Sequence, residues 1–176
     1  MPFVPNHLSI LGIIHTAISI LAIIAGIVAL IRYGKINMTT SPGRAYIWLT
    51  AITCITGFPI MKLGHPTAGH FLGIIILGLI AIGLTAKRLP ALKKGADYIQ
   101  IIAISTTLFL SMIPATVETL TRVPISKPIA SSPNDPLIPK VLLIFVIIYV
   151  VGVTYQLYKL RKSKKGDIPT ITITEA

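Results

Sequence analysis

The sequence predicts an all-α, polytopic membrane helical bundle of about five transmembrane helices, and three observations lead to that prediction. Hydrophobic residues make up 53% of the 176 residues and charged residues only 12%, whereas a soluble domain has roughly 25% charged residues. The apolar residues gather in five long runs, and about 20 consecutive apolar residues suffice to cross the hydrocarbon core of a bilayer. The basic residues fall in short clusters between those runs.

Five spans account for the apolar runs in chain order. The first is too long for a signal peptide and lacks the preceding basic residues, so it is expected to be a mature helix. The second is short, with Pro59 near its end, and its threonines and Gly57 are expected to face neighbouring helices. The third and later spans are longer and more uniformly apolar. The predicted spans are residues 8–31, 45–61, 68–86, 98–120 and 138–157.

The basic clusters predict the orientation of the bundle. Most of the 16 Lys and Arg residues follow spans one, three and five, and Lys and Arg are enriched in cytoplasmic loops. We therefore expect the N-terminus outside, the C-terminus inside, and a location in the cell inner (plasma) membrane. Residues 1–158 form the predicted bundle, and residues 159–176 a polybasic cytoplasmic tail against anionic headgroups. Tyr33, Tyr46 and Trp48 are expected in an aromatic belt at the inner boundary.

The same pattern explains the net charge of +11 without nucleic acid as a partner. The expected partners are the lipid bilayer and either another membrane protein or a second copy of the chain. The single cysteine, Cys54, lies inside an apolar run, where it forms no internal disulfide and behaves as a small hydrophobic residue.

This topology brings the ionisable residues of the spans to the outer half of the bundle. His15 lies about two turns inside span one, roughly 10 Å deep at 1.5 Å per residue. It shares a helix face with small residues (Gly12, Ser19, Ala22 and Gly26), so the imidazole is expected to point into the bundle. Glu118 shares a face of span four with Thr107, Ser111 and Pro114. The predicted outer cluster comprises His7, His15, His65, His70 and Glu118.

Ionisable groups within membrane spans are costly and suggest function, and three chemistries fit this cluster. A b-type haem needs two histidines from facing helices, which His15 with His70 or His65 supplies. A divalent metal is compatible with His7, His65, His70 and Glu118. Proton or quinone chemistry is compatible with His15 or Glu118 as a proton relay.

Simpler interpretations stay open beside these three. Boundary histidines are often merely hydrogen-bonded. Glu118 and Arg122 are four residues apart on one helix and can form an ion pair. Pro66 interrupts the helix between His65 and His70, so those two histidines form no chelating face by themselves.

Short motifs in the first half of the chain carry a resemblance. His15 in an apolar helix with Gly26 is followed by RYGK (Arg32–Lys35), PGRAY (Pro42–Tyr46), TGF (Thr56–Phe58), GHPTAGHFLGI and LTAKR. Over about residues 8–88 this order resembles a family of small bacterial predicted membrane proteins of unknown function. The resemblance implies a membrane protein and brings no established activity. Members often carry a histidine before the Gly-Arg step, where this chain has Pro42. A looser similarity is to small four-helix b-type cytochromes of the membrane.

No catalytic residue is predicted, because the chain lacks the P-loop, Rossmann, HExxH, GxSxG and CxxC patterns. The leading interpretation is an integral membrane protein of unknown biochemical role, for example an accessory subunit with an outer-face histidine cluster, and a non-enzyme is favoured over an enzyme. The alternatives are a b-type haem or metal-binding redox module and a small-solute or proton-coupled carrier.

Overall fold

The computed structural model describes residues 9–60, 65–92 and 95–166, and within these ranges it contains helices and no strand. The predicted all-α class is therefore confirmed for the described part of the chain. Two short 3-10 helices, η1 (Ala86–Arg88) and η2 (Pro90–Leu92), connect the third and fourth helices. The α-helices are α1 (Ile10–Tyr33), α2 (Ser41–Gly57), α3 (Ala68–Thr85), α4 (Ala96–Arg122) and α5 (Leu137–Gly166).

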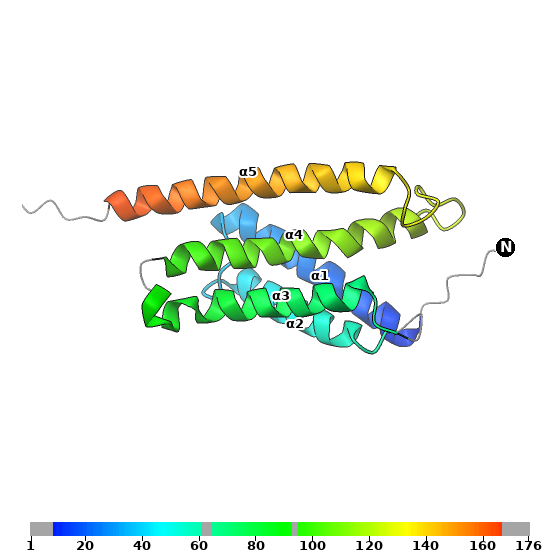
Figure 1. Ribbon diagram of the computed structural model, residues 1–176, viewed down its shortest axis with the longest axis horizontal. Helices are drawn as coiled ribbons and strands as arrows, with labels where there is room; N and C mark the ends of the chain where they lie inside the picture. Colours follow the sequence, from blue (N-terminus) through cyan, green and yellow to red (C-terminus); the bar gives the residue numbers. More distant parts are fainter. Residues whose placement is uncertain (1–8, 61–64, 93–94, 167–176) are drawn as a thin grey trace, which may run out of the picture.

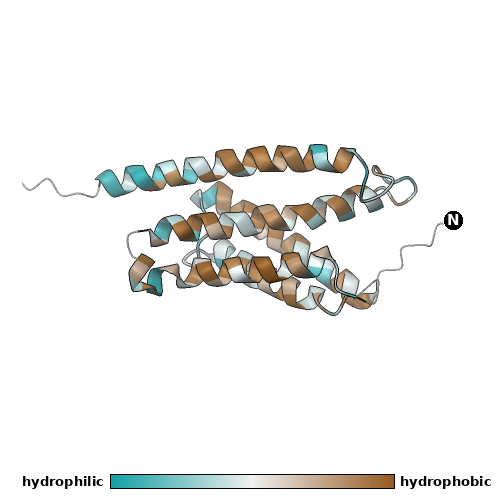
Figure 2. Cartoon of the chain, viewed as in Figure 1, coloured by the Kyte–Doolittle hydropathy of each residue, from teal (hydrophilic) through white to brown (hydrophobic). Residues whose placement is uncertain are grey.

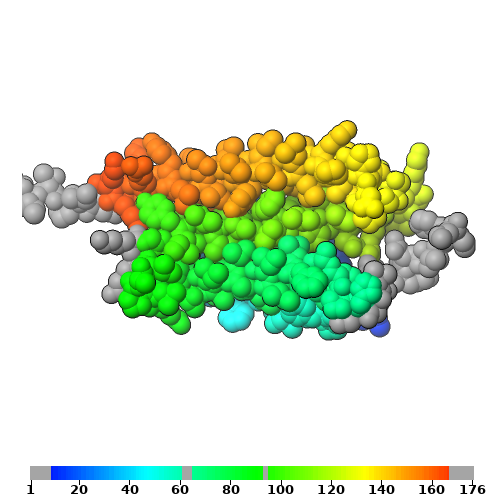
Figure 3. All heavy atoms as spheres, in the orientation of Figure 1, coloured from blue at the N-terminus to red at the C-terminus, as the bar shows by residue number. Residues whose placement is uncertain are grey.

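The five helices lie side by side along the long axis, and α1 begins at the opposite end of the bundle from the end of α5 (Figure 1). Helix α2 packs on α1, α3 packs on both α2 and α4, and α5 packs on α4. Most of the outer surface of α5 carries no other helix (Figure 3), and its apolar side chains, such as Leu143 and Val151, are more than half exposed. Such a surface suits lipid.

Among the residues that the structure describes, four helical segments are long and apolar enough to cross a membrane: α1, α3 extended through η1 (Ala68–Arg88), α4 and α5. Figure 2 shows their apolar central stretches, with hydrophilic residues at the far end of α5. Helix α2 is not among the four. Its 17 residues give a length of ~26 Å at 1.5 Å per residue, a little less than the roughly 30 Å of the hydrocarbon core.

The extents of two helices differ from the predicted membrane spans, each for a local reason. Helix α2 begins at Ser41 rather than Ala45, because the Thr40 hydroxyl caps it by accepting from the Gly43 N–H (3.3 Å) and Pro42 suits the first turn. It ends at Gly57, before Pro59. Helix α5 continues to Gly166 instead of ending at Leu157. Lys, Arg and Leu are good helix formers, so the basic segment 159–165 is helical.

Tyr46 lies in the core, so its expected place in an aromatic belt is wrong. Its side chain is fully buried, and its hydroxyl is 2.7 Å from the Thr107 hydroxyl of α4. The ring packs on Gly26 of α1, where an added Cβ would lie 2.8 Å from Tyr46 Cδ2. Tyr33 and Trp48 are exposed, as belt residues are. Gly12, Ala22 and Gly26 are buried, which confirms the predicted inward face of α1.

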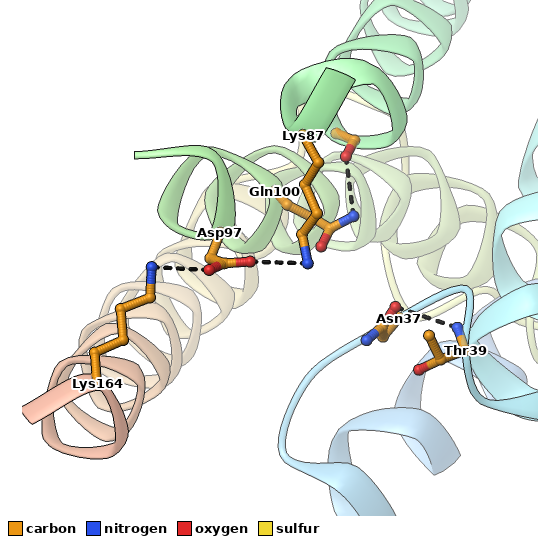
Figure 4. Close-up of polar contacts among 7 residues, drawn as sticks. Asn37, Thr39, Lys87, Asp97, Gln100 and Lys164 are labelled. Atoms are coloured by element: carbon orange, nitrogen blue, oxygen red, sulfur yellow. Dashed lines mark hydrogen bonds and ion pairs between the residues drawn. The ribbon is translucent and has the colours of Figure 1, made fainter. Parts of the chain in front are cut away.

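A branched ion pair joins three helical segments at the end of the bundle where α5 ends (Figure 4). Asp97 of α4 accepts from Lys87 of η1 and from Lys164 of α5, both at 2.8 Å. Lys164 also lies 5.1 Å from the centre of the Tyr98 ring. Nearby, the Gln100 side chain donates to the Gly83 carbonyl of α3 (3.1 Å). These contacts hold α3, α4 and α5 together at this end.

Candidate binding cavity

A cavity of about 370 Å³ lies among α1, α2, α3 and α4, in the half of the bundle where α1 begins and α4 ends. Three residues of the predicted cluster line it: His15 from α1, His70 from α3 and Glu118 from α4. Ser111 and Pro114 of the same α4 face also line it. The structure therefore brings together residues that are up to about a hundred positions apart in the sequence.

His15 lies against α2. Its Nδ1 is 3.2 Å from the Thr56 hydroxyl, which also has the Ile52 carbonyl at 2.9 Å as an acceptor. Gly57 makes room for the ring, since a Cβ there would lie 3.2 Å from His15 Cε1. The predicted inward direction of His15 is confirmed, and the residue both joins α1 to α2 and forms part of the cavity wall.

His70 has both ring nitrogens engaged. Nδ1 accepts a hydrogen bond from the backbone N–H of Thr67 (3.0 Å), so in a neutral ring the proton resides on Nε2. Nε2 in turn donates to the carbonyl of Phe58 (3.1 Å). His70 thus caps the start of α3 and ties it to the end of α2. Coordination of haem or metal by this ring would require one of these bonds to break.

Of the other two histidines, only His65 belongs to the described residues, and it does not join this site. His65 is exposed, its Nδ1–H donates to the carbonyl of Pro66 (3.1 Å), and it does not line the cavity. His7 lies outside the described residues. Within residues 9–60, 65–92 and 95–166, no group of three His, Cys, Asp or Glu side chains is arranged to hold a metal ion.

Glu118 and Arg122 form the ion pair expected from their spacing. Both residues line the cavity, with the Glu118 side chain 52% exposed and that of Arg122 19% exposed. His15 lines the same cavity. A compensated pair of charges therefore lies on the wall of a largely apolar cavity.

Thr50 and Thr53 are cavity residues that the sequence did not single out as a site. Most helical threonines here donate to a carbonyl three or four residues earlier, as Thr106 and Thr116 do. The buried hydroxyls of Thr50 and Thr53 have no hydrogen-bond partner, and Thr50 is only 2% exposed. An unsatisfied buried hydroxyl costs about 1–3 kcal/mol.

The only sequence feature that could have indicated Thr50 and Thr53 was the density of threonines in the short second span, and from it we expected only contacts with neighbouring helices. It could not indicate which hydroxyls would stay unpaired, because that depends on the position of α2 relative to α4.

Comparison with known protein families, with characterised proteins and with solved structures finds no match to this chain. The fold and the cavity are therefore the basis for assigning a function.

Proposed function

We propose that the chain is a small-solute carrier of the inner (plasma) membrane, with five spans, the N-terminus outside and the C-terminus inside. The observation that carries this proposal is the cavity, which combines an apolar wall with His15, the Glu118–Arg122 pair and the unpartnered hydroxyls of Thr50 and Thr53. Small-molecule sites are typically cavities of roughly 300–1,000 Å³ with a few convergent polar groups. At about 370 Å³ this cavity suits a small ligand.

Two features of the bundle support transport rather than static binding. Pro114 lies inside α4 and lines the cavity, and an internal proline removes one helical hydrogen bond and allows the helix to bend there. The Asp97 ion pairs connect α3, α4 and α5 at the other end. In the proposed cycle the cavity is accessible from the outer side while these pairs hold the inner end closed.

The haem and metal interpretations have less support from the geometry. His70 would have to give up a hydrogen bond that starts α3 or one that ties it to α2. His65, the other proposed partner of His15, does not line the cavity. A carrier uses the same residues without breaking these contacts.

Access to the cavity tests the proposal. In a Cys54→Ala background, the Ser111→Cys variant places a thiol on the cavity wall, and the Ile144→Cys variant places one on the exposed apolar face of α5. Oriented liposomes are treated with a charged, membrane-impermeant thiosulfonate. From the outer side we expect Ser111→Cys to react at least about tenfold faster than Ile144→Cys, since thiolates form readily only in contact with water.

The second arm adds Asp97→Asn, which weakens both ion pairs at the inner end. We expect this change to increase the reaction of Ser111→Cys with reagent added on the inner side and to leave Ile144→Cys unchanged. Equal slow reaction of both cysteines from either side would show a closed cavity and contradict the proposal. Outer access that Asp97→Asn never extends to the inner side would contradict the transport cycle.

A further inference from the structure

The hydroxyl groups on the cavity wall are mostly limited to accepting hydrogen bonds. The Thr16 hydroxyl donates to the Gly12 carbonyl (2.8 Å), Ser19 donates to His15 (2.7 Å), and Ser111 donates to Thr107 (2.8 Å). Each hydroxyl has one proton and two lone pairs. With their protons engaged in their own helices, these groups offer only oxygen lone pairs to a bound molecule.

Thr50 and Thr53 differ from them, because their buried hydroxyls have no partner. Both residues come from α2 and line the cavity, as does Ser111 of α4. The Tyr46 hydroxyl lies near Thr50 and Ser111, but its short hydrogen bond is to Thr107. A ligand hydroxyl can satisfy such a site, since it donates to one oxygen and accepts from another.

The charges at the cavity argue against a charged ligand. Glu118 already pairs with Arg122 on the next turn of α4, so a further cation or anion would enter without its own counter-ion. Moving an unpaired charge out of water is far more costly than moving a neutral hydroxyl. The rest of the wall is apolar and includes Ile20, Ile23, Leu72 and Ile76.

We propose that the ligand is a neutral amphiphile with a hydroxyl group at its polar end and an apolar body. The hydroxyl lies among Thr50, Thr53 and Ser111, and the apolar body lies against the isoleucines and leucine of α1 and α3. This inference rests on the proposed function in one respect, the assignment of the cavity as the binding site. It does not depend on transport.

Matched probes test the class of ligand. The purified full-length chain in detergent is titrated with 1-decanol, decyl methyl ether, decylammonium and decanoate, and ligand binding is followed by the rise in Tm. The ether keeps the apolar body but cannot donate a hydrogen bond. We expect decanol to bind about three- to tenfold more tightly than the ether, the effect of about one net hydrogen bond, and more tightly than either ion.

Substitutions test which side chains cause the preference for the alcohol over the ether. Thr50→Val with Thr53→Val removes the two hydroxyls at nearly constant shape and should reduce the alcohol-to-ether preference to about one. Thr121→Val is the control, because Thr121 donates within α4 to Val117 and does not line the cavity. It should keep the full preference. A loss of preference at constant binding of the ether is specific to the hydroxyls and would not follow from general loss of structure.

Three results would overturn the inference: equal binding of alcohol and ether, tighter binding of either ion, or a preference that survives the double variant. Failure here is distinguishable from failure of the carrier proposal. A cavity cysteine accessible from both sides with no alcohol preference would leave the carrier and reject the ligand class. An alcohol preference without access from the inner side would support the ligand class and reject the carrier.

Discussion

Residue 26 determines how closely α1 and α2 can approach. The Tyr46 ring occupies the place where a side chain at Gly26 would begin, with Cδ2 2.8 Å from the ideal Cβ position, and Leu108 of α4 lies 3.1 Å away. Tyr46 is fully buried and cannot move without disturbing its bond to Thr107. A single hydrogen atom in place of a side chain therefore allows three helices to meet at this point.

We expect Gly26→Ala to lower the free energy of unfolding by about 1–3 kcal/mol, the usual cost of overpacking a core. Gly78→Ala is the matched control, because an added Cβ at Gly78 of α3 meets nothing within 4 Å. An alanine in an open helical position is about 0.5–1 kcal/mol more favourable than glycine. Thermal unfolding in one detergent should thus move in opposite directions for the two variants, and a parallel shift would contradict the packing argument.

Thr50 gives a prediction of the opposite sign. Because its buried hydroxyl has no hydrogen-bond partner within the protein, Thr50→Val should raise the free energy of unfolding by about 1–2 kcal/mol by removing an unsatisfied polar group. Thr121→Val removes a hydroxyl that does have a partner and should not stabilise. The free energies of unfolding of both variants, measured by denaturation without added ligand, test this prediction. A destabilised Thr50→Val protein would mean that a bond to Tyr46 or water satisfies the hydroxyl.

At the scale of elements, the segment between α4 and α5 is more ordered than its prolines alone would indicate. Ala130 is buried, and its N–H donates to the carbonyl of Leu120 (2.8 Å). Asp135 accepts from the backbone N–H groups of Ser131 and Leu137, each at 3.0 Å. This carboxylate therefore closes the loop and positions the first turn of α5.

These two N–H donors hold the pKa of Asp135 below its usual value. A carboxyl group whose pKa is lowered by folding stabilises the folded loop above its unfolded pKa of about 3.9, and this contribution disappears as the pH falls through the folded value. We expect the amides of Ser131 and Leu137 to lose hydrogen-exchange protection below about pH 4. The Asp135→Asn variant should show weaker protection with no such pH dependence, and an equal dependence in both proteins would refute the role of Asp135.

The elements also show what sequence reasoning could reach. Apolar run length located the five α-helices of the described residues, because a chain in lipid must satisfy its backbone within helices. Helix periodicity identified the inward direction of His15 and the α4 face that Glu118 shares with Ser111 and Pro114. The errors in the predicted structure arose where helix capping or contacts between helices determine the outcome. Thr40 and Pro42 moved the start of α2, and Tyr46 looked like a belt residue because its pocket at Gly26 depends on how α1 packs. The capping role of His70 requires knowledge of where Phe58 lies.

For the whole molecule, the topology depends on whether α2 crosses the membrane. Four helical segments of the described residues meet the length and composition of a membrane span. Helix α2 is shorter, yet it packs along α1. A crossing α2 leaves α1 beginning and α5 ending on opposite sides of the membrane. It also leaves most basic residues, including Lys35, Arg88 and Arg161, at one end, which the preference for cytoplasmic Lys and Arg assigns to the inside.

Four single cysteines in a Cys54→Ala background test this topology with an impermeant maleimide on intact cells. His65→Cys and Ser132→Cys, both at exposed sites at the proposed outer end, should be labelled. Lys35→Cys and Ser163→Cys, exposed at the other end, should be labelled only after the membrane is permeabilised. The decisive comparison is between the two residues that flank α2. Labelling of Lys35→Cys and His65→Cys from the same side would mean that α2 lies in the membrane without crossing it. The bundle would then have four spans with both termini on one side, and the cavity would open differently from the proposed carrier.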